Sequence, residues 1–365
     1  MVPRNVFREM DEKDEIFKDE RPLQPEYLPE VLPHREGQVQ EIAFSLRGAA
    51  KGDRPENVLI IGPPGTGKTS TVRFVFRQLS EFSQRVSPIY INCWEFSTRH
   101  GILTEIAMRL GTFVPRRGIA TDEIIAEIVA VLRREKRIPV IALDEIDRLF
   151  ANRSCEEKVL YDILRAGENF ETPIGVIGIT NSREFMVRVD TRIRSSLAQR
   201  EIEFRPYTPA QLKDILQERA RLAFVDGVLA EEVVPLCAAH AAKNGGDARL
   251  AIAMLWKAGK LAEKEGARRV EAVHCKGAFS SAVRKVTDER LEGLNAVERR
   301  ILELARESEG LTSGELYALL SREFDETDRT VRNYLQKLAA LKLIKMDVRE
   351  KTKGQRGLTR IIRLA

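Results

Sequence analysis

The sequence predicts an α/β fold, in which a five-stranded parallel sheet has helices on both faces, followed by an all-helical segment and a small terminal domain. Short β-branched runs alternate with amphipathic helical stretches, a pattern typical of parallel sheets. The runs are 58–61, 89–91, 140–143, 174–179 and 202–204. They stop after Pro206 and Pro209, where residues with high helix propensity take over.

Composition excludes several classes of protein. Hydrophobic residues make up 43% of the chain and charged residues 32%, which suffices for a packed core and excludes a disordered chain. The apolar stretches are far shorter than the ~18 residues of a membrane span, and the N-terminus lacks the apolar run of a secretory signal. Four scattered cysteines and four scattered histidines form no zinc or disulfide pattern. We expect a cytoplasmic protein without a membrane partner.

The net charge of +5 is unevenly distributed. Residues 329–365 contain 11 basic residues against two acidic ones, or +9, so the rest of the chain carries −4. A basic end on a slightly acidic body indicates a polyanionic partner. On charge alone, a merely solvated basic face stays an alternative.

The pattern predicts four segments. Residues 1–20 are charged and unpatterned, which predicts a flexible arm, and 21–205 hold the sheet domain. Residues 206–283 predict an all-helical domain. Residues 284–365 predict three helices, the second opened by a capping box at 312–315 and extending to 324, the third starting near Asp328, and then two strands around a basic loop. Three helices and a hairpin are typical of a winged-helix domain.

Residues 62–69 read Gly-Pro-Pro-Gly-Thr-Gly-Lys-Thr and fit the phosphate-loop pattern G-x-x-x-x-G-K-[ST]. The loop follows a strand and precedes a helix, as the pattern requires. Its glycines allow backbone N–H groups to close around phosphate oxygens, and the helix N-terminus adds its dipole. Lys68 would reach the β- and γ-phosphates, and the Thr69 hydroxyl would bind Mg²⁺. The candidate nucleotide-binding residues are Gly62, Pro63, Pro64, Gly65, Thr66, Gly67, Lys68, Thr69 and Ser70.

Polar residues follow two other strands. Asp144 and Glu145 end the apolar run 140–143, where Asp144 is placed to hold Mg²⁺ and Glu145 to orient the attacking water. An exposed acidic strand end is the alternative. Asn181 follows the run 174–179 and could bond the γ-phosphate or the water, although an Asx-turn is also common there. Arg249 begins a helix of the helical domain and could reach the γ-phosphate from a lid, the alternative being a surface arginine.

This combination of phosphate loop, acidic pair, asparagine and lid arginine resembles AAA+ ATPases. Further stretches resemble the archaeal origin-recognition initiators, relatives of the eukaryotic origin recognition complex and its helicase-loading partner. They are Tyr-Leu-Pro-Glu at 27–30, Leu-Pro-His-Arg-Glu at 32–36, Tyr-Ile-Asn-Cys at 90–93 and Phe-Arg-Pro-Tyr at 204–207. The resemblance implies an ATPase that uses ATP/ADP and Mg²⁺, lies at the nucleoid, binds replication origins in double-stranded DNA and helps load the replicative helicase, with paralogous initiator subunits as further partners.

The resemblance also implies roles for individual residues. Leu32, His34 and Arg35 are expected near the adenine, with Tyr207 in the same pocket. An extra helical element before the third strand implies DNA contacts by Arg116 and Arg117, a solvated loop being the alternative. One departure is serine where AAA+ oligomers commonly have a trans-acting arginine, in a Ser-Arg step before the fifth strand. Either Arg192 or Arg194 substitutes, or hydrolysis does not depend on a neighbouring subunit.

The winged-helix tail supplies the remaining DNA candidates. Its third helix would be a recognition helix for the major groove, and its hairpin loop suits the minor groove. The candidates are Arg329, Arg332, Asn333, Lys351, Lys353 and Arg356. We interpret the chain as an ATP-regulated initiator. A winged-helix transcription regulator with an AAA+ module is the alternative, whereas a clamp-loader-like motor disagrees with the tail, because clamp loaders end in a helical collar.

Overall fold

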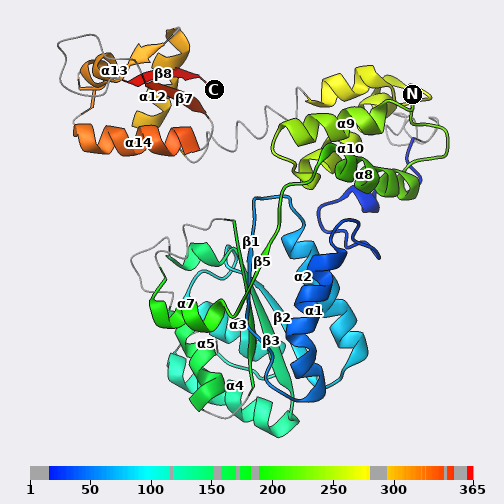
Figure 1. Ribbon diagram of the computed structural model, residues 1–365, viewed down its shortest axis with the longest axis vertical. Helices are drawn as coiled ribbons and strands as arrows, with labels where there is room; N and C mark the ends of the chain where they lie inside the picture. Colours follow the sequence, from blue (N-terminus) through cyan, green and yellow to red (C-terminus); the bar gives the residue numbers. More distant parts are fainter. Residues whose placement is uncertain are drawn as a thin grey trace, which may run out of the picture. The chain divides into compact units, whose positions relative to one another are not determined.

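The structure is a computed structural model in which the chain forms two compact units, residues 1–279 and 280–365 (Figure 1). We describe each unit by itself. The described residues are 16–115, 118–150, 158–169, 173–181, 189–279, 294–308, 310–321, 323–324, 326–340, 343–348 and 360–364.

A five-stranded parallel sheet organises the first unit and confirms the predicted fold. Its strands are β1 (Val58–Ile61), β2 (Val86–Asn92), β3 (Ile138–Asp144), β4 (Gly175–Thr180) and β5 (Arg200–Glu203). The spatial order is β2-β3-β4-β1-β5, with all pairs parallel. β1, β3 and β4 are buried throughout, which explains their uninterrupted apolar sequences. The loops after these three strands therefore meet at one edge of the sheet.

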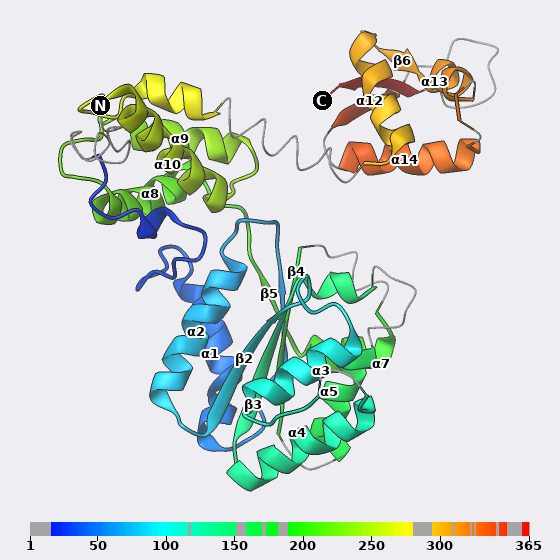
Figure 2. The same ribbon diagram turned by 180° about the vertical axis from the view of Figure 1, so that it is seen from behind.

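Helices cover both faces of this sheet (Figures 1 and 2). One face packs on α1 (Glu36–Lys51) and α2 (Lys68–Phe82) through a core that includes Val58 and Ile60. The other face packs on α3 (Arg99–Arg109), α4 (Thr121–Glu135), α5 (Lys158–Asn169) and α7 (Thr191–Leu197) through a core that includes Leu59 and Ile61. Successive strand residues thus serve opposite cores, as the period of two requires. A short 3-10 helix, η2 (Ile146–Phe150), follows β3.

A helical lid completes the first unit. It contains α8 (Pro209–Ala223), α9 (Val233–Lys243) and α10 (Ala248–Glu265), together with a helical stretch at 272–279. No helix of the described residues is long and apolar enough to cross a membrane. The predicted division between sheet domain and lid at residues 205/206, like that at 283/284, stays a prediction.

Residues 16–20 correct one expectation. The flexible arm predicted for 1–20 is wrong for this part, because Ile16 and Phe17 are buried and the Phe17 ring lies 4.6 Å from that of Phe224. The backbone N–H of Lys18 also donates to the carbonyl of Ala223 over 2.8 Å. The next residues form the 3-10 helix η1 (Arg21–Leu23). Two apolar residues within a charged stretch show no periodicity, so the sequence did not predict this packing.

The second unit is a small helical domain with an antiparallel sheet. It contains α12 (Ala296–Glu307), α13 (Ser313–Leu320) and α14 (Asp328–Ala340), and its strands β6 (Leu311–Thr312), β7 (Ile344–Val348) and β8 (Arg360–Leu364) pair in the order β6-β8-β7. This is the predicted winged-helix pattern. The capping box joins Thr312 and Glu315 as expected. The second helix ends at Leu320, short of residue 324, and the two-residue strand β6 was not predicted.

Candidate nucleotide-binding site

The loop between β1 and α2 has the backbone shape that its glycines allow. Gly65 and Gly67 have φ of 71° and 88°, in the left-handed region where other residues are strained. A Cβ atom on Gly62 would lie 2.3 Å from the carbonyl oxygen of Phe204, so only glycine fits there. The loop can therefore turn its backbone N–H groups toward a phosphate.

The Lys68 ammonium lies inside this loop. Its Nζ donates to the carbonyls of Gly62 and Pro63 over 2.6 and 2.8 Å and to Oδ1 of Asn181 over 2.8 Å. Burial lowers the pKa of Lys68 to about 8, an effect that Asp144 opposes and the nearby Arg249 cation reinforces. The structure thus brings together two predicted site residues, Lys68 of the loop and Asn181 after β4. Phosphate oxygens could replace the oxygen acceptors that now surround the ammonium.

Thr69 and Asp144 form a second pair. Thr69 Oγ1 donates to Asp144 Oδ2 over 2.6 Å, and the Tyr90 hydroxyl donates to the same oxygen over 2.7 Å. Asp144 is only 5% exposed, and burial together with this carboxylate raises the pKa of Tyr90. A hydroxyl and a carboxylate are the oxygen ligands that Mg²⁺ prefers. No cluster of three or more His, Cys, Asp or Glu side chains suited to a metal occurs among the described residues, so Mg²⁺ here would also need phosphate and water ligands.

Glu145 stands in an unusual conformation beside this pair. Its φ is +55°, and its backbone N–H donates to Asp144 Oδ1 over 2.9 Å. Its side chain accepts a hydrogen bond from the indole N–H of Trp94, which follows β2. Tyr90 and Trp94 were not predicted as site residues. Both lie at the end of β2, which is the neighbour of β3 in the sheet. The sequence could have indicated them only if the strand order had been known.

The first turn of the lid helix α10 contacts the phosphate loop. The backbone N–H of Ala248 donates to the carbonyl of Gly65 over 3.0 Å, and Asp247 caps α10 by accepting from the backbone N–H of Arg249 over 2.8 Å. A Cβ atom on Gly65 would fall 1.7 Å from Asp247 Oδ1. The Arg249 side chain is 66% exposed, with its Nε 3.8 Å from Asp247. The lid therefore contacts the loop at Gly65, beside the Asp247 carboxylate. The sequence did not indicate Asp247 as a site residue.

Two of the residues expected near the adenine, Arg35 and Tyr207, lie against the phosphate loop. Arg35 is 4% exposed, donates through Nε to the carbonyl of Thr66 over 2.9 Å and stacks 3.8 Å from the ring centroid of Tyr207. Burial lowers the pKa of Arg35. His34 Nε2 lies 2.8 Å from Asp214 on α8, and Leu32 is half-buried. Arg35 and Tyr207 thus meet at the phosphate loop, and their expected place near the adenine stays a prediction.

The DNA candidates are only partly within the described residues. Arg329, Arg332 and Asn333 are exposed on α14, whose Val331 and Leu335 are buried. The remaining candidates lie outside the described residues, namely Arg116, Arg117, Lys351, Lys353 and Arg356.

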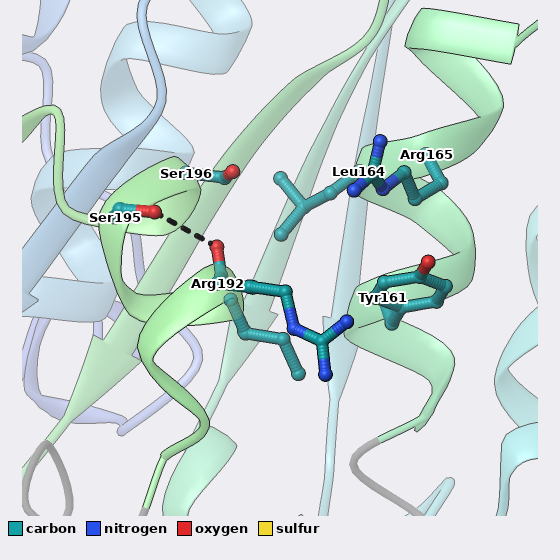
Figure 3. A pocket seen from close by; sticks show the side chains of 7 residues that line it. Tyr161, Leu164, Arg165, Arg192, Ser195 and Ser196 are labelled. Atoms are coloured by element: carbon teal, nitrogen blue, oxygen red, sulfur yellow. Dashed lines mark hydrogen bonds between the residues drawn. The ribbon is translucent and has the colours of Figure 1, made fainter.

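The two arginines considered as trans-acting candidates, Arg192 and Arg194, are both exposed on α7. Arg192 lines a cavity of about 140 Å³ between α5 and α7, with Tyr161, Leu164, Arg165, Ile193, Ser195 and Ser196 (Figure 3). Within it, Ser195 Oγ donates to the carbonyl of Arg192 over 3.0 Å. This cavity holds none of the predicted phosphate-loop or strand-end residues.

The sheet order, the phosphate loop and the helical lid define an AAA+ ATPase. Family profiles agree: one described as "ATPase family associated with various cellular activities (AAA)" matches residues 58–206, and one described as "Cdc6 AAA+ ATPase-type lid domain" matches 213–280. More narrowly, the chain belongs to the family of ORC1-type DNA replication proteins. It is 37% identical to ORC1-type DNA replication protein 1 of Archaeoglobus fulgidus over 99% of this chain and 90% of that protein, and 37% identical to the ORC1-type DNA replication protein of Pyrococcus abyssi over 98% and 90%.

Solved structures show the same relationship. The Aeropyrum pernix ORC1 protein in complex with DNA is 35% identical and superposes with a TM-score of 0.78, covering 96% of this chain and 94% of that one. The Cdc6p protein of Pyrobaculum aerophilum shares the fold, with a TM-score of 0.68, 24% identity and the same coverage. The resemblance stated from the motifs is therefore confirmed.

Proposed function

We propose that this chain is an ATP-regulated initiator that recognises replication origins in double-stranded DNA. One observation carries the nucleotide half of the proposal: Lys68 bonds Asn181 and Thr69 bonds Asp144 at the phosphate loop, and the first turn of α10 lies against that loop. The DNA half is supported by the ORC1-type relatives and by the ORC1 protein solved in complex with DNA.

In the proposed nucleotide site, the backbone of residues 62–70 and Lys68 hold the phosphates of ATP or ADP. Thr69 and Asp144 hold Mg²⁺, which neutralises phosphate charge when it is bound. Glu145 orients a water whose oxygen attacks the γ-phosphorus, and it accepts a proton as the bond to the bridging β–γ oxygen breaks and ADP leaves. Asn181 bonds the γ-phosphate or that water. Arg35, Tyr207, His34 and Leu32 form the nucleoside side of the site.

The lid and the second unit complete the switch in this proposal. Arg249 senses the γ-phosphate from the start of α10 and so distinguishes ATP from ADP. Helix α14 is the recognition helix, with Arg329, Arg332 and Asn333 toward the bases. Lys351, Lys353 and Arg356, and Arg116 with Arg117, are further proposed DNA contacts. In this proposal the protein acts at the nucleoid in the cytoplasm, together with the replicative helicase and paralogous initiator subunits.

Mapping the protein's binding sites along its own genome tests this proposal. An initiator should occupy the few sites at which DNA synthesis starts, whereas the alternative, a transcription regulator, should occupy promoters. The Lys68→Ala variant should bind no ATP. Repeating the mapping with this variant therefore tests whether occupation of the mapped sites depends on the nucleotide. Binding confined to promoters would refute the proposed role.

A further inference from the structure

Two cysteines of the lid are buried and have no part in the proposed nucleotide site. Cys237 lies on α9, and Cys275 lies in the helical stretch at 272–279. Both are free thiols that are 0% exposed. A disulfide tolerates only a narrow range of separations between the two Cα atoms. Whether these thiols can be joined therefore depends on how their two helices are placed.

Contacts before and after the cysteines hold the two helices side by side. Before them, Leu229 and Val270 form a parallel β-bridge, and the Ala230 N–H donates to the Val270 carbonyl over 3.0 Å. After them, the His240 ring stacks on the Phe279 ring, with 4.2 Å between the ring centroids and 14° between the planes. The two segments therefore run in the same direction between these contacts.

The two thiols face each other one helical turn before the stacked rings. Cys237 precedes His240 by three residues, and Cys275 precedes Phe279 by four. Residues at these spacings lie on the same face of a helix. In agreement, the Cys237 thiol donates a hydrogen bond to Cys275 Sγ. The two sulfurs are thus in contact inside the lid.

The contact also makes the two thiols unequal. The hydrogen bond raises the pKa of Cys237, which burial raises further, and it lowers the pKa of Cys275. A thiolate is the nucleophile in disulfide exchange. Cys275 is therefore the thiol that attacks first.

We propose that Cys237 and Cys275 form an intramolecular disulfide by exchange with a small-molecule disulfide. The Cys275 thiolate attacks one sulfur of this donor, whose other sulfur leaves as a thiolate. The Cys237 thiolate then attacks Cys275 Sγ of the mixed disulfide and displaces the second donor sulfur, also as a thiolate. The two cysteines together lose two electrons and two protons, and the donor is reduced to two thiols.

The cross-link closes a loop that contains all of α10. Residues 238–274 lie between the two cysteines, and α10 is Ala248–Glu265. Closing a loop of this length restricts the unfolded chain and so stabilises the lid. Because both thiols are buried, exchange requires the stretch at 272–279 to open locally. This stretch ends the first unit, so its opening does not require the core of the sheet domain to open.

The double variant Cys93→Ala/Cys155→Ala tests the proposal, because it leaves only the two lid thiols. The protein is equilibrated with oxidised and reduced glutathione at increasing ratios, quenched with acid and labelled with N-ethylmaleimide in denaturant. At high ratios the intact mass should show no maleimide and about 2 Da less than the reduced chain. Peptide mapping should give one pair joined at Cys237 and Cys275. Labelling of both thiols at every ratio, or glutathione retained on either as the final product, would overturn the proposal.

Thermal unfolding gives an independent readout. The midpoint of the oxidised wild-type chain should lie about 5–10 °C above that of the reduced chain. Cys237→Ala and Cys275→Ala should each abolish this difference, whereas Cys93→Ala/Cys155→Ala should keep it. A difference that persists without Cys237 would belong to other thiols and would overturn the proposal. If the double variant does not fold, peptide mapping of the wild-type chain after the same labelling identifies the cysteines that pair.

Nucleotide titration tests whether the cross-link acts on the lid alone. The contact of α10 with the phosphate loop, from the Ala248 N–H to the Gly65 carbonyl, does not involve either cysteine. ATP affinity should therefore agree within about twofold between the oxidised and the reduced chain. A larger change would overturn the assignment of the disulfide as a structural link within the lid.

Discussion

The hydroxyl of Thr69 donates to Asp144 Oδ2 over 2.6 Å and so links the first turn of α2 to the end of β3. The two oxygen groups proposed as Mg²⁺ ligands are therefore adjacent before nucleotide enters. Little rearrangement of the chain is needed for them to share one ion.

Thr69→Val should remove the Mg²⁺ dependence of ATP binding. Valine keeps the shape of threonine but cannot bind the ion, so affinity with Mg²⁺ should fall at least about tenfold, the effect of about 1.4 kcal/mol. Isothermal titration of ATP with Mg²⁺ and with chelator measures this. Thr71→Val is the control, since its hydroxyl bonds only the Gly67 carbonyl, over 2.8 Å. Equal Mg²⁺ dependence in Thr69→Val and wild type would contradict the assignment.

ATP affinity should decline as the pH rises above about 8. Burial lowers the pKa of Lys68 from 10.5 to about 8. Between these two pH values the unfolded chain binds a proton at Lys68 that the folded protein does not. The contribution of Lys68 to the free energy of unfolding therefore rises with pH in this range. Phosphates would restore its charge, so ATP binding should take up a proton. Titrations at pH 7.5 to 9.5 in two buffers of different ionisation enthalpy report this uptake. Lys68→Arg stays charged, and an identical pH dependence in that variant would exclude Lys68 as the titrating group.

Gly65→Ala should disturb the contact between loop and lid. Its Cβ would lie 1.7 Å from Asp247 Oδ1, in addition to the strain of a φ of +71°. Gly266→Ala is a matched control, because its φ is +67° and nothing lies within 4 Å of the added atom. Gly266→Ala should cost about 1 kcal/mol of unfolding free energy, and Gly65→Ala about 1–3 kcal/mol more. Denaturant unfolding measures the loss of unfolding free energy in both variants. Equal losses would show that the lid moves away from the added Cβ of residue 65 at no cost.

Arg249→Ala should weaken ATP binding while leaving ADP binding nearly unchanged. The guanidinium is exposed at the start of α10, where it could reach a third phosphate but has no partner on ADP. The ratio of the two dissociation constants, measured by titration, is the test. Arg221→Ala removes an exposed arginine elsewhere in the lid, on α8, and serves as the control. A wild-type ratio in Arg249→Ala would remove this residue from the site.

Arg332→Ala should weaken DNA binding by about 1–3 kcal/mol and relax the preference among sequences, because the recognition helix faces base edges. The dependence of affinity on salt should flatten only if the arginine also neutralises a phosphate. Fluorescence anisotropy with origin and scrambled duplexes measures both effects. Arg306→Ala, exposed on α12, is the control. Undiminished discrimination in Arg332→Ala would mean that α14 does not read the bases.

Local patterns predicted most of this architecture. The phosphate loop, Asp144 and Asn181 could be found because each follows an apolar strand, and parallel strands bring their carboxyl ends to one edge. Tyr90 and Trp94 could not be found, because only the strand order places β2 beside β3. The Trp94–Glu145 contact further depends on a positive φ at Glu145, which tertiary contacts impose and propensity does not predict. Strand β6 is too short for any alternation to show.

The packing of residues 16–20 has a mechanical consequence. From residue 16 onward, the described chain first lies against the lid, where the Lys18 N–H donates to the Ala223 carbonyl. It then crosses to the sheet domain, where the Pro29 carbonyl accepts from Arg77 over 3.1 Å, and it returns to the lid at Tyr207. The two segments that connect the lid and the sheet domain define a hinge axis between these two domains. Rotation about that axis is the motion that leaves both segments unstretched. A probe attached next to Ile16 would report that rotation directly, although it lies far along the chain from residues 280–365, the unit proposed to bind DNA.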